Sequence, residues 1–294
     1  AIADGISLSG AITVTAGSIK LAETGTLASS ISMTGGTLDV DNSLTVSGAL
    51  TLPHEGNITI DVLTDKTLTY TGAGISLGAN TLTLSGGGSL VSGGLTLNDE
   101  DSKLLLNSIT VDSVSTSADS LGLLVGADST VTSLSVAHIT PVSIANTKTL
   151  SGAVTVTAGS LKLNDKGTLV SNIAMSGGTL DADETLSVSG ALVQGGNISI
   201  DVASGKTLTF STGEIKTESY QLTLAGEGTI AFPSNASGIV LNNAAGLLKL
   251  DGIGTLGAAK VTAASNAGKG VAVNASSTIS SLKVAANAEL NVAQ

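Results

Sequence analysis

The sequence predicts an all-β protein, a parallel β-solenoid built from two tandem copies of a unit of about 142–148 residues. Residues 8–50 return at 150–192 with 30 of 43 positions identical, so one architectural unit is laid end to end. Apolar and polar residues alternate in short runs, which is the period of a β-strand. Aromatic residues make up only 1% of the chain, so the core must be narrow and aliphatic.

Short strands are expected, in chain order, wherever this alternation is bounded by Gly, Asn, Asp or Ser. The clearest are residues 57–62 (NITIDV), 67–70 (TLTY) and 81–84 (TLTL), and the others are 12–15, 44–46, 95–97, 109–111 and 131–136. Convincing helical periodicity is lacking, and the Ala-rich residues 257–268 are the nearest candidate for a helix. Helical bundles and alternating βα folds are therefore disfavoured.

Two all-β architectures fit this pattern, tandem sandwiches and a continuous solenoid. Sandwich domains usually anchor their cores with large aromatic side chains, whereas Leu, Ile and Val fill the thin interior of a solenoid. With about 20 residues per coil, each copy holds about seven coils. At roughly 4.8 Å per coil, a continuous rod would be about 65–70 Å long. The phase of the repeat assigns residues 1–142 to the first solenoid copy and 143–294 to the second.

Charge and composition exclude several classes of function. The net charge of −11 and the pI of about 4.4 oppose binding to nucleic acid or to an anionic membrane surface. Cysteine is absent, which removes disulfides and thiolate metal sites. No apolar run reaches transmembrane length, and the first residues lack the features of a signal peptide. The acidic, Ser/Thr-rich and arginine-free composition favours an extracellular or cell-surface location.

Several segments resemble the coils of bacterial surface β-helices, namely autotransporter passenger domains and filamentous-haemagglutinin-type adhesins. The resemblance rests on GKTLTFSTG (205–213), NTLTLSGGGSL (80–90) and NSLTVSGAL (42–50). It is a similarity in the style of the coil, and it maps no functional residue of those families onto this chain. The resemblance implies a right-handed β-helix that acts as a stalk or an adhesin outside the cell.

Two glycine motifs look like nucleotide-binding loops, but both are better explained as turns. Gly252-Ile253-Gly254-Thr255-Leu256-Gly257 matches the dinucleotide pattern, yet no helix or suitably placed acidic residue is expected after it. Gly205-Lys206-Thr207 is similar to the end of a phosphate-binding loop, but position 200 is Ile where the loop requires Gly. We therefore expect no nucleotide cofactor.

Groups for catalysis are scarce, and the chain is not expected to be an enzyme. His54 and His138 are the only imidazoles and are interpreted as loop residues. Asp61 with Lys66, and Asp201 with Lys206, are the only recurring acid–base neighbours, and outward strand charges explain them better. A carbohydrate-active β-helix enzyme is only the third alternative. Such enzymes need clustered acidic and basic groups in one groove, and this chain has few recurring acid–base neighbours.

Recurring acidic residues are weak candidates for calcium ligands, because oxygen-rich turns can hold Ca²⁺. The candidates are Asp39, Asp41, Asp99, Asp101, Asp181 and Asp183. Solvated charges that discourage edge-to-edge pairing are the commoner explanation. No other cofactor is expected. The sequons at Asn57, Asn197, Asn235 and Asn274 leave glycosylation open.

The two terminal segments of the chain have few of the charges and prolines that discourage self-association of strand edges. Residues 1–16 and 284–294 each carry one charge and no proline, and both resemble interior coils of the repeat. A solenoid normally needs capping coils, because its terminal strands expose unpaired backbone groups. We therefore expect either head-to-tail stacking of copies into a filament, or a fragment of a longer repeat protein that has its caps elsewhere.

The function expected is that of a non-catalytic extracellular structural protein, a surface filament subunit or rigid stalk whose main partner is another copy of itself. The alternative is an adhesin that binds glycans or cell-surface proteins. Neither interpretation involves nucleic acid or insertion into a membrane.

Overall fold

The computed structural model describes residues 10–53, 56–212, 214–263, 270–284 and 289–292. Within these residues the chain is all-β, without a helix, and its parallel sheets are stacked as a β-solenoid with roughly 21 residues per turn. The predicted fold class and the expected coil length are therefore confirmed. The chain divides into two compact units, Ala1–Gly152 and Ala153–Gln294, and the boundary falls within strand β19 (Thr149–Val156).

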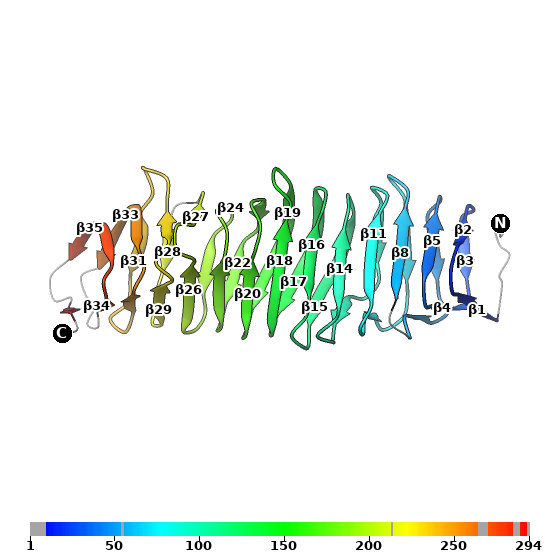
Figure 1. The fold of residues 1–294 in the computed structure, drawn as a ribbon, viewed down its shortest axis with the longest axis horizontal. Helices are drawn as coiled ribbons and strands as arrows, with labels where there is room; N and C mark the ends of the chain where they lie inside the picture. The colour runs from blue at the N-terminus through cyan, green and yellow to red at the C-terminus, as the bar shows by residue number, and fades with distance from the viewer. Residues whose placement is uncertain (1–9, 54–55, 213, 264–269, 285–288, 293–294) are drawn as a thin grey trace. The chain divides into compact units, whose positions relative to one another are not determined.

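Unit 1 is built from three rows of short parallel strands, one row for each face of its coils (Figure 1). The first face holds β2 (Ser18–Leu21), β5 (Gly36–Val40), β8 (Asn57–Val62), β11 (Thr81–Ser85), β14 (Lys103–Leu106), β16 (Gly122–Val125) and β18 (Ile139–Ile144). The second face holds β3 (Gly25–Leu27), β6 (Leu44–Val46), β9 (Thr67–Tyr70) and β12 (Ser89–Val91). The third holds β1 (Ala11–Val14), β4 (Ser30–Met33), β7 (Leu50–Thr51), β10 (Ile75–Ser76) and β13 (Leu95–Leu97). The longer strands β15 (Thr110–Thr116) and β17 (Ser129–Val136) extend over both the second and the third face.

Unit 2 repeats this arrangement. Its first face holds β20 (Ser160–Leu163), β23 (Thr179–Ala182), β26 (Ile198–Val202), β29 (Gln221–Ala225), β32 (Leu247–Asp251), β34 (Val271–Ala275) and β36 (Leu290–Val292). The second face holds β21 (Thr168–Val170), β24 (Leu186–Val188), β27 (Thr207–Phe210) and β30 (Thr229–Ala231). The third holds β22 (Ile173–Met175), β25 (Leu192–Gln194), β28 (Glu214–Lys216) and β31 (Gly238–Leu241). In the last coils β33 (Thr255–Ala263) pairs with strands of both the second and the third face, and β35 (Thr278–Val284) pairs with β33.

Alternation along each strand sends every second side chain into the coil, where it stacks on its counterparts in the neighbouring coils. On the first face of unit 1 one such inward column is Leu38, Ile60, Leu84, Leu106, Val125 and Ile144, all buried. Burial of one such side chain contributes about 1.5–3 kcal/mol. The aliphatic columns are therefore the main source of stability.

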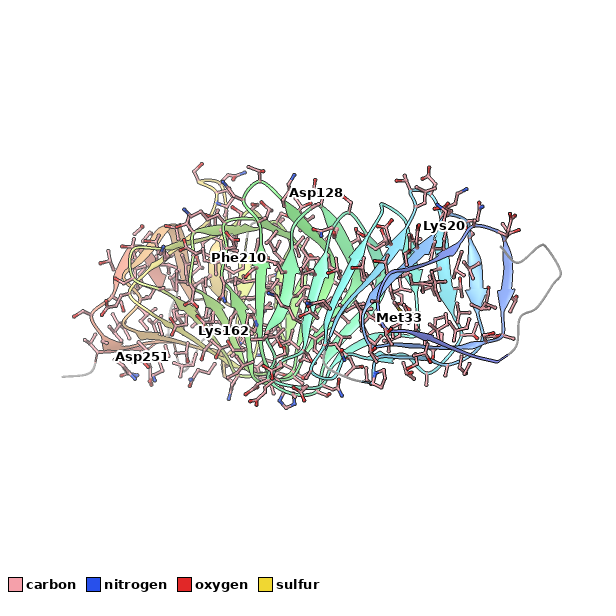
Figure 2. All side chains as sticks on the ribbon, turned by 45° about the vertical axis from the view of Figure 1, so that its right-hand side comes forward. Lys20, Met33, Asp128, Lys162, Phe210 and Asp251 are labelled. Carbon is pink, nitrogen blue, oxygen red and sulfur yellow. The ribbon has the colours of Figure 1, made fainter. Side chains whose placement is uncertain are left out.

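Three of the four aromatic side chains are buried in the same interior. Phe210 and Phe232 stack in unit 2 with their ring centroids 5.6 Å apart. Tyr70, the counterpart of Phe210 in unit 1, is also buried. Met33 and Phe210 mark the interior of the two units in Figure 2.

Glycine allows one coil to pass over the bend of the previous coil. Ser29 follows β3 and Ser171 follows β21, and both serines are buried at the bend. A Cβ atom on Gly48 would lie 2.1 Å from the carbonyl oxygen of Ser29, and one on Gly190 would lie 1.6 Å from that of Ser171. No side chain fits at these distances, so glycine is required at this place in both units.

The strand limits differ in detail from those expected. The expected strand at 109–111 begins at Thr110 and continues to Thr116, because the two faces merge there. The Ala-rich segment 257–268 is extended strand through Ala263, and its remainder lies outside the described residues.

Candidate functional site

Two of the three aspartate pairs predicted as calcium candidates each surround a lysine from the previous coil. In unit 1, Lys20 Nζ lies 2.6 Å from Asp41 Oδ2 and 3.7 Å from Asp39 Oδ2. In unit 2, Lys162 Nζ lies 3.2 Å from Asp181 Oδ2 and 3.5 Å from the Oδ2 atom of Asp183. Figure 2 labels both lysines.

Strand register explains these clusters. Lys20 of β2 pairs with Asp39 of β5, and Lys162 of β20 pairs with Asp181 of β23. Cross-strand neighbours on one face lie close enough for opposite charges to attract. The sequence analysis missed the lysine, although both copies repeat a Lys one coil ahead of the Asp and that spacing could have revealed it.

In the unit 2 cluster the pKa values of both the lysine and one of its aspartates are raised, for different reasons. The hydrogen bond from Lys162 to Asp181, followed by the charge of that carboxylate, raises the pKa of the lysine. Burial raises the pKa of Asp181 and outweighs the hydrogen bond from Lys162, and the charges of Asp183 and Asp201 add to the rise. The same kind of hydrogen bond, from Lys20 to Asp41, raises the pKa of Lys20 in unit 1. A metal ion at either pair would have to displace the ammonium group.

The third pair of calcium candidates forms a turn. The backbone N–H of Asp101 donates to Asp99 Oδ1 at 3.0 Å, and Ser102 Oγ accepts from the Asp99 N–H at 3.0 Å. The same hydroxyl donates to the carbonyl oxygen of Gly78 at 2.6 Å and so ties the turn to the previous coil. In the residues that the structure describes there is no group of three or more His, Cys, Asp or Glu side chains placed to hold a metal ion. The calcium assignment therefore stays a prediction.

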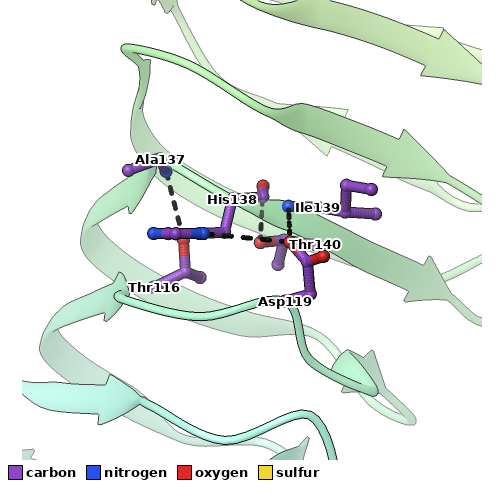
Figure 3. A network of polar contacts seen from close by, with 6 residues as sticks. All are labelled: Thr116, Asp119, Ala137, His138, Ile139 and Thr140. Atoms are coloured by element: carbon purple, nitrogen blue, oxygen red, sulfur yellow. Dashed lines mark hydrogen bonds and ion pairs between the residues drawn. The ribbon is translucent and has the colours of Figure 1, made fainter.

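His138 lies at a bend beside Asp119 (Figure 3). Its Nδ1 atom is 3.8 Å from Asp119 Oδ1, which accepts a hydrogen bond from the Ile139 N–H at 2.9 Å. Thr116 Oγ1 accepts from the Ala137 N–H at 3.1 Å, and Thr140 Oγ1 donates to the His138 carbonyl at 3.3 Å. Each hydrogen bond involves a backbone group, so the network holds the bend. His54 lies outside the described residues.

The recurring acid–base neighbours make other contacts. Asp61 accepts a hydrogen bond from Ser85 on the next coil. Lys206 Nζ lies 2.8 Å from Glu184 Oε1, and this hydrogen bond lowers the pKa of the glutamate. Among the described residues no ion pair joins Asp61 to Lys66, or Asp201 to Lys206.

Both glycine motifs are turns. Gly252 lies between β32 and β33, and Ile253 and Leu256 are buried in the core. The segment that follows is strand, so it offers no helix N-terminus for a phosphate. The backbone N–H of Lys206 closes the other turn by donating to the Ala203 carbonyl at 3.0 Å. Its counterpart in unit 1, the N–H of Lys66, donates to the Leu63 carbonyl at 2.9 Å.

All four sequon asparagines are exposed: Asn57, Asn197, Asn235 and Asn274. Asn197 Oδ1 accepts a hydrogen bond from the Gln221 N–H at 2.9 Å. Exposure is compatible with modification, and glycosylation stays a prediction.

Three concavities stand out in the described residues. One, of about 290 Å³ in unit 1, is lined in part by Ser108, Asp128 and Thr149, and the other two have more apolar linings. In unit 1 a cavity of about 240 Å³ opens beside the first described coil, and Ile12, Ile19 and Leu21 are among its lining residues. In unit 2 a groove of about 210 Å³ lies between β25 and β28 and is lined in part by Val193, Glu214, Lys216 and Glu218. We call these the first-coil cavity and the second-unit groove. Sequence reasoning identified neither.

Comparison of the chain with protein-family models, curated proteins and solved structures gives no match. Within the described residues, helices long and apolar enough to cross a membrane are absent.

Proposed function

We propose that the protein is a non-catalytic, extracellular structural protein, a β-solenoid filament subunit or stalk that extends by end-to-end stacking of coils. We place it among surface β-helix proteins of the autotransporter passenger and filamentous-haemagglutinin type. The observation that carries the proposal is the exposure of inward-column side chains on the first described coil of unit 1 and on the last described coil of unit 2.

The first-coil cavity supports this proposal from unit 1. Ile12, Ile19 and Leu21 occupy inward positions but are only half-buried. Their counterparts in unit 2, Val154, Leu161 and Leu163, are fully buried. In the part of the chain that the structure describes, β2 pairs only with β5, and its other backbone edge has no partner strand among these residues. Apolar side chains beside a free strand edge form a surface that another coil can cover.

The last described coil of unit 2 has the matching features. Leu290 and Val292 lie in register with Val271 and Val273 of β34, but they are 51% and 65% exposed. Within the described residues β36 pairs only with β34. A parallel strand added to β36 would continue the ladder and bury both side chains, as happens at every interior coil.

The mechanism is mechanical. The open edge of β2 on one copy and the open edge of β36 on the next would make a heterologous contact between two different surfaces, which generates an open filament when it is repeated between copies. Nearest-neighbour contacts between coils then supply the stability along the array. A longer chain that continues the coils would use the same contacts as a stalk.

The test is sedimentation velocity and electron microscopy of the purified chain over a wide range of concentration. We expect fibres of uniform width that shorten on dilution. If only dispersed single chains are seen at the highest concentration, the filament proposal is excluded and the stalk proposal remains. Surface labelling of intact source cells tests the extracellular location separately.

A further inference from the structure

The two units differ along one row of outward-facing residues on the third face. In unit 1 the register places a hydroxyl residue at every position of this row: Thr13, Ser32 and Thr51, then Ser76, Thr96, Ser115 and Ser135. In unit 2 the row runs through Thr155, Ala174, Val193, Lys216, Val240 and Thr262. Inward neighbours at the start of the row keep their character, since Ile31 and Met33 correspond to Ile173 and Met175. Those beside Val193 and Lys216 do not, because buried leucines of unit 1 are replaced there by Gln194 and Thr217. The divergence is therefore concentrated around Val193 and Lys216, on both sides of the strands.

The second-unit groove lies on this changed row. Val193 is 57% exposed at its centre, in register with Lys216. Lys216 Nζ lies 2.8 Å from Glu214 Oε1, and this hydrogen bond lowers the pKa of the glutamate. Glu218 adds a second carboxylate, for which the described residues provide no ion pair. The groove therefore combines an aliphatic surface with an excess of negative charge.

Three residues at the groove are costly for the fold. Glu218 has a φ of 44°, a left-handed backbone that suits the Gly78 found at the same place in unit 1, where φ is 55°. Gln194 and Thr217 are buried, and Gln194 Oε1 and Thr217 Oγ1 have no hydrogen-bond partner.

The corresponding residues of unit 1 are Leu52 and Leu77, which carry no such unpaired atoms. An unsatisfied buried polar group and a strained backbone both reduce stability, and such features cluster at functional sites. At the same bend unit 1 has glycine at the left-handed position and one unpaired buried atom, Asn80 Oδ1, so the cost is greater at the second-unit groove.

We propose that the second-unit groove binds an extended protein segment that presents a basic side chain next to an aliphatic one. The basic group would pair with Glu218 and the aliphatic side chain would cover Val193. Charge complementarity favours this partner, because the groove has an excess carboxylate and the whole chain has a net charge of −11. This site is lateral and independent of the end-to-end stacking.

The experiment uses the ¹⁵N-labelled full chain and two capped octapeptides, one alternating Val and Arg and the other alternating Val and Glu. We expect the Val–Arg peptide to shift the amide signals of Val193, Lys216 and Glu218, and to leave those of Thr51 and Ser76 unchanged. Glu218→Gln should weaken binding by about tenfold, since it removes a charge-assisted hydrogen bond. Glu100→Gln, which removes the same charge from an exposed turn of unit 1, should change it less than about twofold.

Two further variants separate binding from folding. Glu218→Gly restores the residue of unit 1 and should raise the melting temperature by about 2 °C or more while it weakens binding. Val193→Thr should weaken binding without altering the melting temperature. Equal weakening by Glu100→Gln and Glu218→Gln would reduce the effect to general charge attraction and overturn the proposal. So would equal binding of the Val–Glu peptide, or no binding of the Val–Arg peptide.

Discussion

At the scale of single residues, a lysine between two carboxylates gives each unit a charge cluster of limited energetic value. Exposed ion pairs contribute about 0–1 kcal/mol, because water and salt screen them. The Lys162 side chain is 32% exposed and that of Lys20 is 58% exposed. The cluster in unit 2 is therefore the one in which the charge state should affect stability.

Replacing Lys162 by Gln should reduce the free energy of unfolding by less than about 1 kcal/mol at neutral pH. The pKa of Lys162 is raised in the folded state, so its contribution is present below the unfolded pKa and is lost as the pH rises through the folded pKa. Urea unfolding at about pH 7 and about pH 11 checks this, because the difference between wild type and variant should begin to shrink at the higher pH. Lys20→Gln, at the more exposed site, should change stability less, and the opposite order would contradict the assignment.

The contribution of Asp181 to stability should change with pH in the opposite direction to that of an ordinary carboxylate in an ion pair. Burial raises its pKa in the folded state, so the folded protein binds the proton more tightly than the unfolded chain does. Its contribution to stability therefore falls as the pH rises through the interval between the two pKa values. Relative to wild type, Asp181→Asn should become more favourable between about pH 4 and pH 7, as measured by urea unfolding. A variant that loses stability relative to wild type over this interval would contradict the raised pKa.

Residue-level prediction from the sequence succeeded where a pattern was local. The recurrence of Asp39 and Asp41 as Asp181 and Asp183 was evident, but their lysine partner depends on which coil lies beside which. The strained Glu218 was invisible, because a turn residue with a positive φ cannot be distinguished by type when it is not glycine. The coil register supplies the lysine partner, and the backbone conformation of the turn supplies the strain at Glu218.

At the scale of elements, the bends are the points where neighbouring coils approach most closely. Gly190→Ala should reduce the free energy of unfolding by about 3 kcal/mol, because its Cβ atom would overlap the backbone of Ser171. Gly195→Ala is the matched control in the same coil, since the nearest atom to its Cβ would be 3.6 Å away. It should change stability by no more than about 0.5 kcal/mol. Thermal or urea unfolding compares the two, and equal effects would mean that backbone entropy rather than close contact sets the cost.

Strands were the most predictable elements, because alternation over four to six residues is sufficient to assign both the extended backbone and the inward face. Thus 57–62 and 67–70 were expected as strands and are β8 and β9. The merging of two faces in β15 was not predicted, since it depends on the length of the coil beneath it. The bends were recognised only as glycine-rich intervals, and the contact that requires Gly48 and Gly190 is a property of stacked coils.

At the scale of the whole molecule, the duplication and the lack of aromatic residues were enough to favour a solenoid over sandwiches. A stack buries its core by nearest-neighbour contacts, so a narrow aliphatic interior suffices if coils repeat. Those features do not reveal how the units have diverged on their outer surfaces. The duplication matches Val193 with Thr51 and Glu218 with Gly78, but the second-unit groove became visible only when the register placed Val193 beside Lys216.

End-to-end stacking makes a specific prediction about the last described strand. Changing both Leu290 and Val292 to Lys should abolish fibres, or raise the concentration at which they form by at least about tenfold, because two charges would have to be buried in the new contact. Both side chains are exposed in the single chain, so the melting temperature of the dispersed protein should stay within about 2 °C of the wild-type value.

Val193→Lys together with Val170→Lys is the control for this double variant. It adds the same charge at two exposed valines that lie on the lateral surface of unit 2 rather than on its last coil. Fibres should persist in this control, because neither side chain takes part in the coil-on-coil contact. If the control dissolves the fibres as completely as the β36 variant does, net charge governs assembly; fibres unaffected by either variant would mean that copies meet through some surface other than the free edge of β36.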